Sequence, residues 1–167
     1  DSRISISGAS GSGGLFKIGD TVTATWNNTA GGDNNSNVAG VTVDFSQFGG
    51  GSAVSASNSS GTWTASYTIV AGSIDAATRN VSVSATDTAG NSATTADTTN
   101  ATVDNQTPAV TAANISIGGA TGTGGAFKTG DTVTASWDNT ASGNNNTDIS
   151  SVTMDFTRLS PPCRCTY

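Results

Sequence analysis

Apolar and polar residues alternate with a period of two in several short stretches of this chain. In one stretch Val22, Ala24 and Trp26 alternate with threonines, and in another Trp63, Ala65 and Tyr67 alternate with Thr and Ser. Successive side chains of a β-strand point to opposite faces, so each stretch predicts a strand with one buried and one wet face. Similar stretches predict strands at 4–6, 41–45, 81–86 and 94–103, with a short edge strand near Val54. Clusters of Gly, Asn and Ser separate the strands, and only residues 72–78 are expected to form a turn of helix.

About seven short strands in roughly 100 residues are typical of an immunoglobulin-like antiparallel β-sandwich. We therefore predict an all-β fold in which Trp26, Phe45, Trp63 and Tyr67 fill the space between two sheets. This part of the chain has no cysteine to join the sheets, so aromatic and β-branched packing must hold them together. A β-barrel is the alternative fold.

The chain repeats itself with a period of 111 residues (115 − 4). Aligned without gaps, residues 4–48 and 115–159 are identical at 27 of 45 positions. This identity predicts a tandem repeat of domains near 100 residues each, because the period is too long for a solenoid unit. We expect a complete domain at residues 1–104 and a truncated second copy, with only its first strands, at residues 105–167.

The last residues depart from the repeat. After Phe156 the second copy reads TRLSPPCRCTY, where the first copy continues with further strands. A truncated or frame-shifted end would produce such an atypical tail. Cys163 and Cys165 are separated by one residue, which is too close for an ordinary disulfide, and no His is present to complete a zinc site.

Composition excludes several functional classes. The net charge is −6 and all twelve acidic residues are Asp, so an electrostatic nucleic-acid binder is excluded. No apolar run is long enough to span a membrane. The chain has no His and no Glu, which removes the commonest general bases, so we expect no enzyme and no catalytic residues.

Three motifs resemble those of bacterial immunoglobulin-like tandem repeats. They are GDTVTATW at residues 19–26, VSVSATDTAGNSAT at 81–94 and VDNQTPAV at 103–110. Such repeats form the stalks of large surface adhesins, including biofilm-associated proteins. The resemblance implies an extracellular spacer on the bacterial cell surface, with neighbouring repeats as partners and a cell-surface or matrix ligand bound through other domains. The alternative is a secreted module that binds carbohydrate or another ligand.

Calcium is the one cofactor that the residues suggest, and the first candidate site is a loop. Asp33, Asn35 and Asn37 are spaced like the first ligands of a calcium loop, and Asn144, Asn146 and Asp148 occupy the equivalent positions in the second copy. Each copy has a single carboxylate there. Turn formation by Asn and Asp side chains explains the same pattern without a metal ion.

The second candidate is a calcium site at the junction of the two domains. Asp87 and Asn91 lie in the DTAGN turn, Asp104 lies in the linker, and Asp131 begins a strand of the second copy. The resemblance to adhesin arrays implies a calcium ion that stiffens this joint. The alternative is that Asp87 and Asn91 cap their own turn and Asp104 ends a strand.

Overall fold

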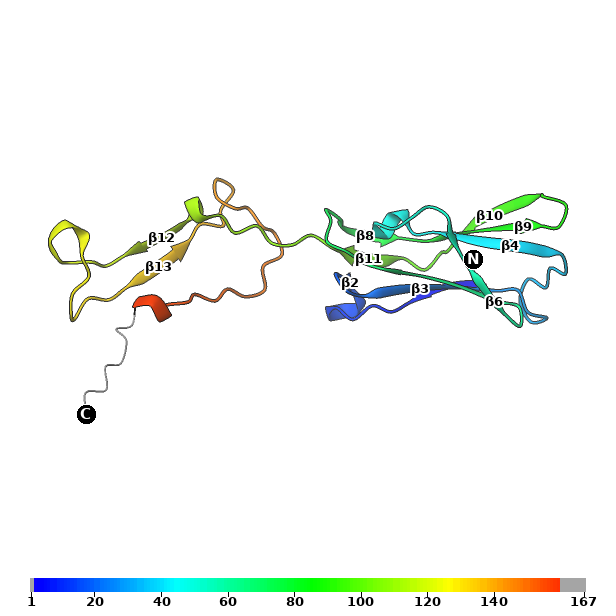
Figure 1. Cartoon of the computed structure of the whole chain (residues 1–167), viewed down its shortest axis with the longest axis horizontal. Coiled ribbons are helices and arrows are strands. Elements are labelled where there is room, and N and C mark those ends of the chain that lie inside the picture. Colours follow the sequence, from blue (N-terminus) through cyan, green and yellow to red (C-terminus); the bar gives the residue numbers. More distant parts are fainter. Residues whose placement is uncertain (1, 160–167) are drawn as a thin grey trace, which may run out of the picture. The chain divides into compact units, whose positions relative to one another are not determined.

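The computed structural model describes residues 2–159, so the atypical tail with Cys163 and Cys165 lies outside the described residues. The chain divides into two compact units, Asp1–Thr107 and Pro108–Tyr167, which we call unit 1 and unit 2. Both are drawn in Figure 1.

Unit 1 is all-β and consists of three small sheets. The first has the strand order β1 (Ile4–Ser7), β3 (Thr21–Asn27), β7 (Thr62–Thr68) and β6 (Ser57–Ser59). The second has the order β10 (Ser92–Ala96), β9 (Ser82–Asp87), β4 (Val38–Asp44) and β5 (Val54–Ser55). The third has the order β2 (Phe16–Lys17), β11 (Ala101–Asp104) and β8 (Asp75–Arg79), and the β2–β11 pair is parallel. None of these sheets closes on itself within the described residues, and the arrangement is consistent with a β-sandwich (Figure 1).

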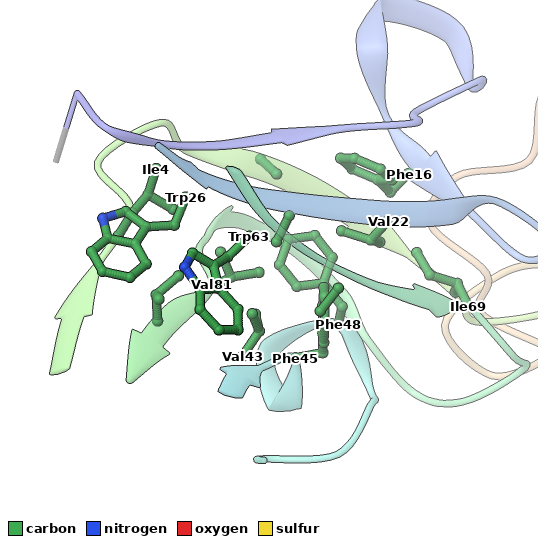
Figure 2. Close-up of a cluster of buried hydrophobic side chains, with 14 of the residues drawn as sticks. Ile4, Phe16, Val22, Trp26, Val43, Phe45, Phe48, Trp63, Ile69 and Val81 are labelled. Atoms are coloured by element: carbon green, nitrogen blue, oxygen red, sulfur yellow. The ribbon is translucent and has the colours of Figure 1, made fainter. Parts of the chain in front are cut away.

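Most of the core comes from the first two sheets, where the alternation predicts it, and Phe16, Ala101 and Val103 of the third sheet complete it. Trp26 on β3 and Trp63 on β7 are opposite one another in the antiparallel register and are only 7% and 9% exposed. Both indoles lie among Ile4, Val43 and Val81 in Figure 2. The predicted burial of both tryptophans is therefore confirmed.

One part of the core comes from a turn and not from a strand. Phe48 ends the short 3₁₀ helix η2 (Ser46–Phe48) and is fully buried. Its ring meets Phe16 edge to face, with 5.5 Å between centroids and an interplanar angle of 87°. Alternation could not reveal Phe48, because a 3₁₀ turn has no period of two.

The outer faces of the sheets carry pairs of hydroxyl groups across neighbouring strands. Thr21 and Thr68 lie 3.1 Å apart through their hydroxyl oxygens, and Thr23 and Ser66 lie 3.2 Å apart. Comparable hydrogen bonds join Ser5 to Thr25, Ser84 to Thr94 and Thr86 to Ser92. The Thr- and Ser-rich face of each predicted strand is therefore a hydrogen-bonded surface.

Two local predictions for unit 1 are wrong. The expected helical turn at residues 72–78 is replaced by strand β8, which pairs antiparallel with β11. The expected strand at 94–103 is two strands, β10 and β11, separated by the buried Asp97, whose N–H donates to the carbonyl of Val81. In both places pairing with a distant strand outweighs the local pattern.

Unit 2 repeats the beginning of unit 1. Strands β12 (Ile115–Gly118) and β13 (Thr134–Trp137) pair antiparallel, and Ile115 lies opposite Trp137 as Ile4 lies opposite Trp26. Residues 152–156 are the counterpart of the strand predicted at 41–45, but they form no strand, and Val152 is 51% exposed. No residue that the structure describes in unit 2 is buried. The remaining 3₁₀ helices are η1 (Ser12–Gly14), η3 (Ala112–Asn114), η4 (Thr123–Gly125) and η5 (Thr157–Leu159).

Candidate functional site

One end of unit 1 brings together two segments that the sequence assigned to separate sites. The loop after β3 contains Asp33, Asn35 and Asn37, and the turn between β9 and β10 contains Asp87 and Asn91. These five residues line one open groove of about 340 Å³. The two segments touch directly, since the N–H of Thr88 donates to the carbonyl of Asn37 at 3.0 Å.

Side-chain hydrogen bonds fix the loop after β3. The indole Nε1 of Trp26 donates to Oδ2 of Asp33 at 2.7 Å. Asn28 and Asn35 bind one another: Asn28 Nδ2 donates to the Asn35 carbonyl at 2.9 Å, and the Asn35 N–H donates to Asn28 Oδ1 at 2.7 Å. Asn34, between them, has a φ of 54°, a conformation that Asn tolerates better than most residues. The loop is therefore a defined wall of the groove.

Asp87 closes the β9–β10 turn in the same manner. Its Oδ1 accepts hydrogen bonds from the N–H groups of Ala89 at 2.9 Å and Asn91 at 2.8 Å, and its Oδ2 accepts one from Asn91 Nδ2 at 2.9 Å. The Asn91 side-chain amide, followed by the Asn91 N–H, lowers the pKa of Asp87 below its usual value. Both carboxylate oxygens of Asp87 thus accept hydrogen bonds within the turn.

The other two residues of the expected junction site lie elsewhere. Asp104 on β11 is opposite Lys17 and Asp75, at the other end of unit 1 from the β9–β10 turn (Figure 1). Its Oδ1 accepts a hydrogen bond from the Gln106 N–H at 3.0 Å. The structure therefore does not bring Asp104 to Asp87 and Asn91.

Asp131 belongs to a hydrogen-bonded turn of unit 2, and Asp20 makes the same turn in unit 1. The Asp131 carboxylate accepts hydrogen bonds from the Thr121 hydroxyl and from the N–H of Lys128, which lower its pKa. The Asp20 carboxylate accepts them from the Ser10 hydroxyl at 2.5 Å, the Ser10 N–H at 2.9 Å and the Lys17 N–H at 3.0 Å. These bonds, the Ser10 hydroxyl foremost, lower the pKa of Asp20 to about 2.

The carboxylates around the groove are the candidate calcium ligands. Among residues 2–159 no group of three or more His, Cys, Asp or Glu side chains could hold a metal ion. The Asp33 carboxylate accepts a hydrogen bond from the Trp26 indole N–H, and the Asp87 carboxylate accepts three hydrogen bonds from donors in its own turn. These hydrogen bonds hold both segments without a cation, so calcium at either candidate site stays a prediction.

Unit 2 contains the same loop with the same bonds. Trp137 Nε1 donates to Asn144 Oδ1 at 2.7 Å, as Trp26 donates to Asp33. Asn139 and Asn146 repeat the Asn28–Asn35 pair, with Asn139 Nδ2 donating to the Asn146 carbonyl at 3.0 Å. Each bond joins residues seven apart, and both copies keep this spacing. The repeated spacing was the signal in the sequence from which the loop could have been recognised.

Comparison with known proteins identified no related protein. No protein-family model, no curated protein and no solved structure matches the chain. Within the described residues, no helix has the length and apolarity needed to cross a membrane. What the protein does must therefore follow from its own residues and geometry.

Proposed function

We propose that unit 1 is an immunoglobulin-like module of a tandem array and that unit 2 is the first part of the next module. The order β1-β3-β7-β6 corresponds to strands A, B, E and D of such a sandwich, and β10-β9-β4-β5 corresponds to G, F, C and one added strand. Both strand orders match those of an immunoglobulin-like sandwich, and this match supports the assignment. The short strand β2, which follows β1 along the chain, pairs in parallel with β11, the last strand of unit 1.

We further propose that the modules act as a structural spacer of a large extracellular adhesin on a bacterial surface. The observation that carries this proposal is that the loop between Trp26 and Asn35 recurs in unit 2 with its hydrogen bonds intact. A repeated binding module tends to vary the loops that read its ligand, whereas a spacer repeats its scaffold. The partners of each module are then its neighbours in the chain, and adhesion to cells or matrix belongs to other domains.

The aromatic residues of unit 1 support a spacer over a carbohydrate-binding module. All of the aromatic side chains in residues 2–107 are buried or half-buried. A sugar-binding platform needs the exposed face of an aromatic ring, and no aromatic side chain in residues 2–107 is in the exposed class. The missing His and Glu residues also support a role without catalysis.

Scattering and binding measurements test this proposal together. Arrays of one, two and three complete modules, each with the sequence of residues 1–111, should increase in maximum dimension in equal steps. Calcium added to the same arrays tests the predicted junction ion, which would lengthen or stiffen them. Saturable micromolar binding of an oligosaccharide to one module would overturn the spacer and favour the carbohydrate-binding alternative.

A further inference from the structure

The groove at the end of unit 1 has an apolar floor beneath a polar rim. Ile4, Trp26 and Val38 supply apolar side chains from three different strands, and Val83 and Ala93 continue the apolar lining from β9 and β10. The loop after β3 and the β9–β10 turn form the rim. Such a surface fits an extended peptide that has a small apolar side chain and a backbone able to hydrogen-bond with the rim.

Unit 2 shows such a peptide in contact with the equivalent loop. The N–H of Ala109 donates to Asn146 Oδ1 at 2.7 Å, and Asn146 Nδ2 donates back to the Ala109 carbonyl at 2.9 Å. The N–H of Thr111 donates to Asn144 Oδ1 at 3.2 Å, and Asn144 Nδ2 donates to the Thr111 hydroxyl at 3.2 Å. Two asparagine side chains thus bind alternate residues of an extended segment, as a neighbouring strand would.

The apolar residues of this segment lie at the counterpart of part of that floor. Pro108 and Val110 line one hollow together with Ile115, Trp137 and Ile149. With the period of 111, the last three residues are equivalent to Ile4, Trp26 and Val38, which form the floor in unit 1. Two rim residues of the unit 1 groove therefore have counterparts that bind residues 109 and 111, and three floor residues have counterparts that share a hollow with residues 108 and 110.

Unit 1 has the groups needed to bind a segment of this kind. Asn35 is equivalent to Asn146, and within the part of the chain that the structure describes its Oδ1 accepts no hydrogen bond. Asp33 replaces Asn144, and its carboxylate can accept from both a backbone N–H and a threonine hydroxyl. The exposed edge strand β10 adds a wall beside the groove.

We propose that the groove of unit 1 binds the Pro-Ala-Val-Thr linker of a preceding module, in the arrangement that residues 108–111 adopt on unit 2. The inference rests on the proposed function, because it assigns the occupant to the array. Each linker is then held by the module that follows it. A joint anchored by one valine and two side-chain amides or carboxylates resists bending without a metal ion.

The test extends the full chain with its own linker. Residues 104–111 are copied directly in front of Asp1, so that the copied valine stands five residues before Ile4, as Val110 stands before Ile115. Hydrogen exchange in peptides covering residues 27–40 and 82–96 should slow by about threefold, since Val110 is 60% exposed on unit 2 and a valine buried to that extent gains less than half of the full burial energy. The matched control carries the same extension with its copy of Val110 changed to Asp, and it should exchange like the unextended chain.

A second variant tests the polar contact. Asn35→Ala should destabilise unit 1 by itself, because it removes the hydrogen bond from Asn35 Nδ2 to Asn28 Oδ1. Its effect is therefore measured with and without the extension. The extension should protect the Asn35→Ala chain clearly less than the original chain. Absence of protection by the original extension, or equal protection by the Asp control, would overturn the proposal whatever Asn35→Ala does.

Failure of this docking is distinguishable from failure of the spacer. An extension without effect leaves a spacer with free linkers, whose arrays still lengthen in equal steps. Oligosaccharide binding to a single module removes the spacer itself, independently of hydrogen exchange in the extended chain.

Discussion

Trp26 and Trp63 are cross-strand neighbours in the same core, but their indole nitrogens differ in environment. Trp26 Nε1 donates to Asp33 at 2.7 Å, whereas Trp63 Nε1 is buried and has no partner among the described residues. Replacing either residue by Phe removes the same atoms from the core. The difference between Trp26→Phe and Trp63→Phe therefore isolates the two N–H groups.

The expected difference can be estimated from hydrogen-bond energies. Trp26→Phe loses a hydrogen bond to a charged group, worth about 1.5–3 kcal/mol. Trp63→Phe removes an unsatisfied buried donor, which otherwise costs about 1–3 kcal/mol. Because Asp33 is exposed and regains water, we take the low end of both values. Trp26→Phe should then destabilise unit 1 by about 2–3 kcal/mol more than Trp63→Phe.

Native-state hydrogen exchange provides the assay. The slowest amides of β3 and β7 report global unfolding of unit 1 within the full chain. Asp33→Asn is the control that the chain itself offers, because Asn144 accepts the equivalent bond from Trp137 at the same 2.7 Å. This control should keep most of the stability. Equal losses for the two Phe variants, or a larger loss for Trp63→Phe, would refute the reasoning.

Three further predictions concern pH, backbone strain and the second unit. Because the folded pKa of Asp20 is lowered from 3.8 to about 2, its contribution to stability is present above its unfolded pKa and lost as pH falls from about 4 to about 2. Asp20→Asn should lower stability at neutral pH and flatten acid unfolding in that window, and an unchanged acid transition would contradict this. Gly8 and Gly13 both have positive φ, but a Cβ at Gly8 would collide with the backbone of β3 while one at Gly13 meets nothing. Urea unfolding should give a cost of about 1–2 kcal/mol for Gly13→Ala and about 3 kcal/mol or more for Gly8→Ala, where overpacking adds to strain. Residues 108–159 should exchange hydrogen much faster than unit 1, because none of them is buried, and equal protection in an isolated monomer would contradict this.

The parts of the fold that the sequence predicts are those with one buried face. Alternation identified β3, β4 and β7 and their inward residues, among them Val22, Val43 and Ala65, because a period of two fixes which side meets the core. Strand β8 was missed because DAATR has no apolar alternation, and its strand conformation depends on pairing with β11. Residues 152–156 have the alternation but form no strand, which shows that the pattern needs a partner strand.

The candidate site was harder to predict than the fold. Asp33, Asn35 and Asp87 were identified as notable residues, but their meeting around one groove depends on the β4–β9 pairing, which brings Val38 opposite Asp87. The contact of residues 109 and 111 with Asn146 and Asn144 spans more than 30 positions along the chain. Neither composition nor local spacing contains such long-range information.

The hydroxyl pairs on the outer faces of unit 1 have a consequence for its response to salt. Thr21–Thr68 and Thr23–Ser66 join strands through uncharged groups, whereas the Lys17–Asp20 salt bridge, at 3.7 Å, lies within one turn and joins no strands of these sheets. Ionic screening weakens exposed ion pairs but leaves neutral hydrogen bonds nearly unchanged. With a net charge of −6, added salt only relieves repulsion among the aspartates. The sheet surface should therefore keep its cross-strand contacts at both low and high ionic strength. A surface built from Lys–Glu pairs would lose part of its contacts at high ionic strength.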